Sequence, residues 1–136
     1  MPLSYVDANY WIYWFDERLP EHEFVDNAMQ AAIQGAVVVS TVTLMEVAHY
    51  FRTLQPKVLS ERMKTITNLS TLNLIDFSST IMHSSINFLS TYARVGLGSR
   101  DCVILATMKA SGSGVLLTHD KAFKKVKDIT VIDEII

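Results

Sequence analysis

The sequence predicts an α/β fold: a three-layer sandwich with a central five-stranded, mostly parallel sheet. Short runs rich in Val, Ile and Leu recur along the 136 residues, and they lack the strict alternation of strands that face water on one side. Longer segments with apolar side chains at helical spacing separate these runs. Strands that alternate with helices form βα units, and right-handed crossovers then place helices over the sheet.

The predicted strands are short and apolar. They span residues 3–7, 36–41, 72–77, 115–118 and 129–132. The second contains Val37, Val38 and Val39 in succession, so apolar side chains point to both faces of the sheet. A Ser-Gly-Ser-Gly run at residues 111–114 precedes the fourth strand and is typical of a turn. These features favour strands that are covered on both faces.

The predicted helices lie between the strands. They span residues 22–34, 43–51, 57–69, 79–92 and 99–110. Gly35 supplies a stop for the first of them, and Leu44, Val47 and Phe51 recur at helical spacing in the second. Cys102 lies among apolar residues of the last helix, and we interpret it as a small core side chain.

The composition limits the class of protein. With 49% hydrophobic and 19% charged residues the chain is not disordered, and its length suits one domain over residues 1–136. No apolar stretch approaches the roughly 20 residues of a spanning helix, and no basic region precedes an apolar run at the start. The single cysteine cannot form an internal disulfide. We therefore expect a cytoplasmic protein in a reducing compartment, without a membrane partner.

The net charge is −2, from 12 Lys and Arg against 14 Asp and Glu. A net acidic chain is not the usual footprint of a nucleic-acid-binding protein. However, four carboxylates clustered around metal ions would leave a basic balance elsewhere. The net charge therefore does not decide whether nucleic acid is a partner.

Four acids occur where a site is expected in a parallel sheet. Asp7 ends the first predicted strand, Glu46 lies early in the helix after the second, Asp101 opens the helix before the fourth, and Asp120 follows the fourth. Sites in such sheets lie outside the carboxyl ends of the strands. Each acid alone has a structural interpretation, because an acid in a first helical turn complements the helix dipole and Asp120 can cap the next turn.

Their joint placement predicts a metal site. Carboxylates held at one edge of a sheet repel each other, and burial raises that cost. Divalent cations relieve the repulsion, and an all-oxygen ligand set favours Mg²⁺ or Mn²⁺ over Zn²⁺.

Four segments in order resemble a known family. They are Tyr5-Val6-Asp7-Ala8-Asn9, Thr43-Leu44-Met45-Glu46-Val47, Ser99-Arg100-Asp101-Cys102-Val103-Ile104-Leu105-Ala106 and Leu117-Thr118-His119-Asp120-Lys121-Ala122-Phe123. No segment is diagnostic alone, but together and at these separations the series is similar to the PIN-domain ribonucleases, and specifically to the toxins of VapBC-type toxin–antitoxin pairs. The resemblance covers essentially the whole chain.

The resemblance implies metal-dependent cleavage of RNA by a toxin that a cognate antitoxin inhibits and that pairs as a homodimer. The acids carried over are Asp7, Glu46, Asp101 and Asp120, with Mg²⁺ or Mn²⁺ as the implied ion. Asn9 and Thr118 match positions that orient ligands or water, whereas Arg100 and Lys121 are candidates for phosphate contacts. The segment at residues 98–100 departs from many relatives, which carry a bulkier residue before the third acid.

Five aromatic residues lie within residues 10–15. One interpretation is a thick edge of the core, since one helix face cannot bury them all. The other is an aromatic groove for an amphipathic partner segment, and the resemblance implies that this segment is the antitoxin. In that case Trp11, Trp14 and Phe51 are the predicted groove residues.

Two other functions stay open at this point. A non-catalytic RNA-binding or interaction module on the same fold needs no metal. A receiver-type signalling domain would use Asp76, which ends the third predicted strand, but the acidic pair and the late lysine of that class are missing. His49 lies three residues beyond Glu46 on the same predicted helix and could face the site, but we favour a partly buried structural histidine.

Overall fold

A computed structural model describes residues 3–136, and its strands form one parallel sheet in the order β3-β2-β1-β4-β5. The strands are β1 (Leu3–Val6), β2 (Ala36–Ser40), β3 (Leu72–Ile75), β4 (Val115–Leu117) and β5 (Thr130–Ile132). The predicted five-stranded sheet is confirmed. The first four strands end one or two residues earlier than predicted, and at β1 and β2 the reason is helix capping. The side chains of Asp7 and Ser40 accept hydrogen bonds from the helices that follow.

Helices occupy the connections between strands. They are α1 (Ala8–Phe15), α2 (His22–Gln34), α3 (Thr41–Tyr50), α4 (Pro56–Thr67), α5 (Ser79–Tyr92) and α6 (Ser99–Ser111), with short 3₁₀ turns η1 (Ala93–Val95) and η2 (Lys121–Lys125). Helix α1 was not among the predicted helices, because its dense aromatic residues hide a helical period. Between residues 3 and 136 no helix is both long and apolar enough to cross a membrane.

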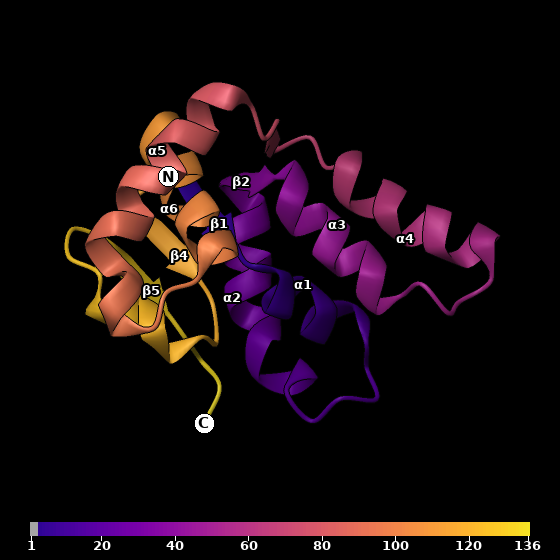
Figure 1. Cartoon of the computed structure of the whole chain (residues 1–136). Coiled ribbons are helices and arrows are strands. Elements are labelled where there is room, and N and C mark those ends of the chain that lie inside the picture. The colour runs from indigo at the N-terminus through magenta and orange to yellow at the C-terminus, as the bar shows by residue number, and fades with distance from the viewer. Residues whose placement is uncertain (1–2) are drawn as a thin grey trace.

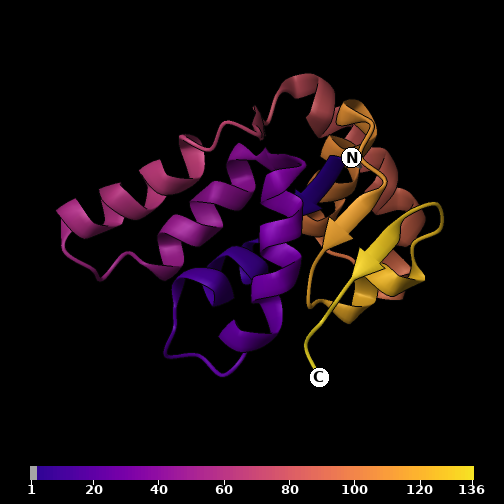
Figure 2. The same cartoon turned by 180° about the vertical axis from the view of Figure 1, so that it is seen from behind.

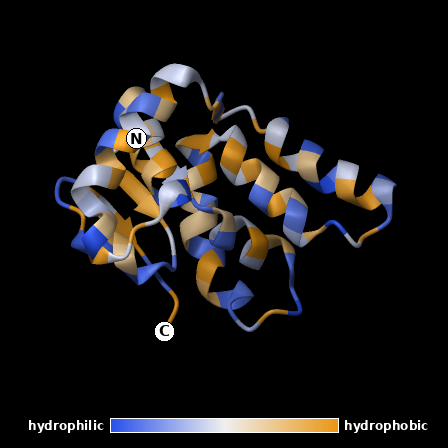
Figure 3. Ribbon diagram, viewed as in Figure 1, coloured by the Kyte–Doolittle hydropathy of each residue, from blue (hydrophilic) through white to orange (hydrophobic). Residues whose placement is uncertain are grey.

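The two faces of the sheet bury separate apolar clusters. In β2, Val37 and Val39 pack into one cluster with α1, α2 and α3, whereas Val38 packs into the other cluster with α6 and η2. The run of valines therefore has the predicted cover on both faces. Figures 1 and 2 show the sheet between its two helical layers, and Figure 3 shows that the strands are hydrophobic. The predicted three-layer sandwich is confirmed.

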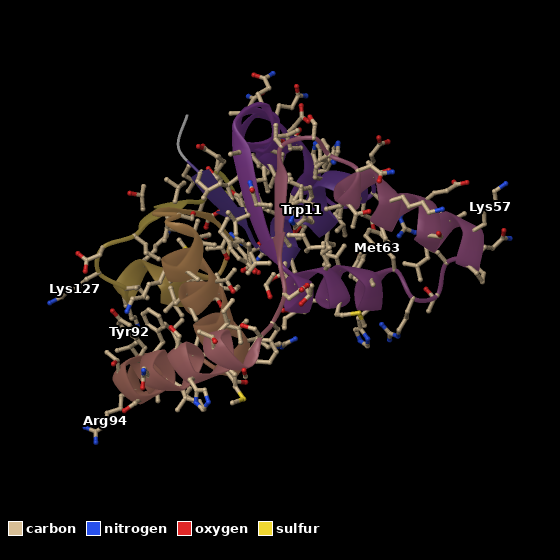
Figure 4. The ribbon with its side chains drawn as sticks, turned by 90° about the horizontal axis from the view of Figure 1, so that it is seen from above. Trp11, Lys57, Met63, Tyr92, Arg94 and Lys127 are labelled. Atoms are coloured by element: carbon tan, nitrogen blue, oxygen red, sulfur yellow. The ribbon has the colours of Figure 1, made fainter. Side chains whose placement is uncertain are left out.

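Helices α3 and α4 project side by side away from the sheet (Figures 1 and 2). Only Ile66 of α4 is fully buried, and Met63 packs against the α1–α3 cluster. Arg62 of α4 lies 5.0 Å from the ring centre of Phe51 and donates a hydrogen bond to the Phe15 carbonyl at 3.2 Å. Figure 4 shows Lys57 at the outer end of this pair of helices. Helix α3 thus begins at the sheet and carries its later residues well away from it.

Candidate functional site

The sheet has a topological switch point between β1 and β4. The chain runs from β1 to β2 to β3 toward one edge, and then returns through α5 and α6 to place β4 on the other side of β1. Connections leave β1 and β4 in opposite directions, so a crevice opens at their carboxyl ends. Asp7 directly follows β1, and Thr118 directly follows β4.

A cavity of about 720 Å³ opens at this place. The structure brings all four predicted acids to its wall, together with Asn9 and Arg100. The acids reach it from different elements, namely from the ends of β1 and β4, from α3 and from the first turn of α6; they are Asp7, Glu46, Asp101 and Asp120. Residues that are more than 100 positions apart in the sequence therefore share one site.

Asp7 is the most buried of the four acids, with 8% of its surface exposed. Its Oδ1 accepts a hydrogen bond from the Ala8 amide at 2.7 Å, and its Oδ2 accepts one from the Thr118 hydroxyl at 2.7 Å. Within residues 3–136 no cationic side chain forms an ion pair with it. Burial raises the pKa of Asp7 to about 6, and repulsion from Glu46 and Asp101 adds to the rise.

Thr118 and Asn9 tie the segment after β4 to helix α1. The fully buried Thr118 hydroxyl accepts hydrogen bonds from the Asp120 amide at 3.0 Å and from the Asn9 side chain at 3.4 Å. The Asn9 carbonyl oxygen accepts a bond from the His119 amide at 3.3 Å. These bonds hold Asp120 close to Asp7, as expected for residues that orient a site.

The remaining acids have partners of their own. The Asp101 carboxylate accepts a hydrogen bond from the Gly98 amide at 3.0 Å, and burial raises its pKa, with a contribution from Asp120. Glu46 forms an ion pair with Arg100 at 3.2 Å; burial raises the Glu46 pKa and Arg100 opposes that rise. Asp120 caps η2 through a bond from the Ala122 amide at 3.0 Å, so its structural interpretation also holds.

The donor set is suited to a hard divalent cation. Every predicted ligand is a carboxylate oxygen, and in the described part of the chain the buried Asp7 carboxylate has two neutral donors and no cation beside it. Within residues 3–136, however, no three His, Cys, Asp or Glu side chains are close enough together to hold a metal ion. The acids therefore line the same cavity without forming a closed ligand cage, and Glu46 is turned toward Arg100.

The PIN domain family model matches residues 4–129. The chain belongs to the PIN domain family. The search of curated proteins found no significant match to this chain. A toxin–antitoxin complex from Klebsiella pneumoniae is 25% identical, with a TM-score of 0.70 over 95% of each chain. VapC20 from Mycobacterium tuberculosis, described as a sarcin-ricin loop cleaving toxin, is 15% identical, with a TM-score of 0.75 over 89% of this chain and 92% of that one.

A third solved structure also has this fold. It is VapBC2 from Rickettsia felis bound to a promoter DNA fragment, which is 17% identical, with a TM-score of 0.73 over 96% of this chain and 98% of that one.

The receiver-type alternative is wrong for a PIN domain. Receiver domains order their strands 2-1-3-4-5, whereas here β1 lies between β2 and β4. Asp76 is exposed beyond the edge strand β3 and does not line the cavity.

Two of the predicted groove side chains lie elsewhere in this PIN domain than expected. Trp11 is fully buried and donates a hydrogen bond to the Val6 carbonyl at 3.1 Å, and Phe51 is also buried. Figure 4 shows Trp11 surrounded by other side chains in the interior. These two residues belong to the core rather than to a partner groove, because burial by neighbouring helices leaves them no free surface. Trp14 is only partly buried and bonds Asp26 at 3.2 Å. Lys121 is exposed on η2 directly after Asp120, outside the cavity wall, and stays a predicted phosphate contact.

The outer part of the cavity was not predicted from the sequence, apart from the option that His49 faces the site. The favoured interpretation of His49 as partly buried is wrong, because it is exposed and lines the cavity. Met45, Tyr50 and Arg52 also line it. Met45 and His49 are four residues apart, as are Glu46 and Tyr50, so helical spacing from Glu46 was the available signal.

Proposed function

We propose that this PIN domain is a metal-dependent endoribonuclease and the toxin of a type II toxin–antitoxin pair. The observation that carries the proposal is the convergence of Asp7, Glu46, Asp101 and Asp120 on one cavity, where Asp7 is buried without a cation beside it. The toxin assignment is supported by the structural neighbours, which include toxin–antitoxin complexes and a toxin that cleaves the sarcin-ricin loop. A toxin that cleaves RNA inside the cell would act in the cytoplasm, and we include this location in the proposal.

Asp7 and Asp101 would hold Mg²⁺ or Mn²⁺, and Glu46 and Asp120 would complete the ligand set or hold a second ion. The bound ion would supply charge relief at phosphorus and a more acidic water. The Thr118 hydroxyl and the Ala8 amide orient the two oxygens of Asp7, and Asn9 holds the loop that carries Asp120. Arg100, whose side chain is 71% exposed, can contact a phosphate oxygen of the strand.

Cleavage of single-stranded RNA with Mg²⁺, with Mn²⁺ and with excess chelator tests the proposal. We expect cleavage with either ion and none in chelator. Asp7→Asn and Asp101→Asn should each lower the rate at least about 100-fold, by analogy with the loss of other preorganised electrostatic groups. Asp76→Asn is the matched control, since this acid is exposed and outside the cavity.

Cleavage that persists in chelator would contradict the metal-dependent reaction. Tight RNA binding without cleavage under any ion would instead support the non-catalytic alternative. Among the described residues the buried Asp7 carboxylate has no cationic partner, and this favours the enzyme, because an uncompensated buried charge is costly and a binding module does not need it.

The partners belong to the same proposal. We propose a cognate antitoxin as the inhibitor, and a homodimer as the assembly. Exposed apolar side chains on β3 and α5 and in the loop between them supply a surface for pairing: Leu74, Phe77, Met82 and Ile86. A monomer in sedimentation at tens of micromolar, where a standard-sized interface holds, would count against the homodimer.

A further inference from the structure

The cavity continues along α3 beyond the four acids. Helix α3 starts where β2 ends and runs away from the sheet (Figure 1). Tyr50 follows Glu46 by four residues, which is about 6 Å along the helix axis, and Arg52 lies just past the helix end. One nucleotide of an extended strand can span this distance. The outer wall of the cavity carries apolar and cationic side chains, in contrast to the acidic residues near the sheet.

The Tyr50 ring is fixed in place. Its hydroxyl donates a hydrogen bond to Asp16 at 2.8 Å, and Asp16 is itself buried and bound by two nitrogens of the Arg18 guanidinium at 2.9 Å each. The ring also meets Phe51 edge to face, with 4.9 Å between centroids. Even so, 39% of Tyr50 is exposed and the residue lines the cavity. A ring that is anchored at its hydroxyl and packed against Phe51 still presents open surface.

Arg52 follows Tyr50 by two residues and lines the same cavity. Arg52 is exposed and uses one nitrogen to donate a hydrogen bond to the His49 carbonyl at 2.8 Å. Within residues 3–136 its other guanidinium nitrogens have no protein partner, and no acid forms an ion pair with it. An anchored aromatic ring and an available guanidinium in the same cavity are the combination that binds single-stranded nucleic acid, through base stacking and phosphate contact.

We propose that Tyr50 and Arg52 form a nucleotide subsite in which the base beside the scissile phosphate stacks on the Tyr50 ring and a flanking phosphate contacts Arg52. The subsite rests on the proposed ribonuclease function and names the part of the substrate that the acids do not contact. A base can stack on a protein ring only when it leaves its own helix, so the substrate is an unpaired stretch of RNA. The anchor to Asp16 lowers the ordering cost on binding, because the ring does not have to be immobilised.

The test measures binding of a short single-stranded RNA that carries one 2-aminopurine. The Asp7→Asn protein is used so that the RNA stays intact. Tyr50→Leu should weaken binding about five- to hundredfold and abolish the fluorescence quenching that stacking produces. Tyr50→Phe keeps the ring and loses only the bond to Asp16, so it should retain the quenching and bind within about threefold of the parent. Arg52→Gln should weaken binding and reduce the salt slope by about one.

Tyr92→Leu is the matched control, because Tyr92 lies on α5, far from the α3–α4 pair in Figure 4. It should leave binding unchanged. Circular dichroism of each variant checks that a loss of binding is not a loss of fold. In the cleavage-competent protein, Tyr50→Leu should raise KM while changing kcat less than about threefold.

Several outcomes would overturn the subsite. One is a folded Tyr50→Leu protein that binds and quenches like the parent, and another is Tyr50→Phe losing as much as Tyr50→Leu. A third is Tyr50→Leu impairing antitoxin binding alone, which would assign the ring to the protein partner. Failure of the nuclease proposal looks different: RNA still binds and quenches through Tyr50, but no ion supports cleavage by the wild-type protein.

Discussion

Helix α1 has a buried acid at each end, and the two acids behave in opposite ways. Asp7 precedes the helix and is 8% exposed, whereas Asp16 follows it and is 5% exposed. Burial raises the pKa of Asp7 to about 6, but hydrogen bonds from Arg18, with a further one from Tyr50, hold the pKa of Asp16 well below its usual range. Both side chains are thus covered from solvent, but their surroundings differ: Asp7 lies deep in the protein, whereas Asp16 lies near the surface beside the largely exposed Arg18.

The comparison teaches how to separate a structural acid from a functional one. The chain itself neutralises Asp16, because the Arg18 guanidinium bonds both oxygens. Among residues 3–136 Asp7 receives only neutral donors and faces other acids, so no described side chain balances its charge. Burial of an acid is thus a weak sign of function, and burial without a cation is a stronger one.

The largest expected effect is on Asp7 itself. Its pKa is higher in the folded protein, about 6 against 3.8, so the folded state binds more protons between these values. Its contribution to the free energy of unfolding is therefore present at low pH and lost as the pH rises through about 6. Without metal, Asp7→Asn should stabilise the protein by about 1–3 kcal/mol at pH 8 and by much less near pH 4.

Urea unfolding of both proteins at pH 4, 6 and 8 measures this difference. Mg²⁺ should raise the midpoint of the wild-type protein at pH 8 and leave that of Asp7→Asn nearly unchanged. A variant that is less stable than the wild type at pH 8 would show that Asp7 is already compensated, and the contrast with Asp16 would disappear.

A smaller effect of opposite sign is expected at Asp16. Asp16→Ala removes the partner of the Tyr50 hydroxyl and should destabilise the protein by about 1–2 kcal/mol. The loss is no larger because the Arg18 side chain is largely exposed and regains water. The loss should be the same at pH 6 and pH 8, because the pKa of Asp16 is low and the group stays ionised at both. Thermal unfolding at the two pH values checks this. A loss that doubles between them would mean that Asp16 titrates like Asp7.

The smallest effect is expected for the Glu46–Arg100 pair. Its carboxylate resembles Asp7 in that burial raises its pKa, and Asp16 in that an arginine lowers it. The Arg100 side chain is 71% exposed and the Glu46 side chain 27%, so Arg100→Gln should cost about 0.5 kcal/mol or less. Because Arg100 lowers the pKa of Glu46, its removal should move that pKa further up. An NMR titration of the Glu46 carboxyl measures the shift, and a shift in the downward direction would contradict this account.

Much of this protein follows from short-range pattern in the sequence. The apolar runs predicted the five strands, and the helical periods predicted α2 and α5 at their observed bounds. The acids at strand ends and helix starts predicted which four carboxylates share a cavity. These features were accessible because strand alternation, helical spacing and the rule for parallel sheets all relate residues within one element or one crossover.

Only the tertiary structure decided the rest. It placed Trp11 in the core, because that ring is fully buried in the apolar cluster between the sheet and the helices on one of its faces. It paired Asp16 with Tyr50, 34 residues away, and so separated a neutralised acid from an uncompensated one. It also turned Glu46 toward Arg100, 54 residues away. Charge compensation depends on which side chains meet across elements, and no period within a single segment carries that information.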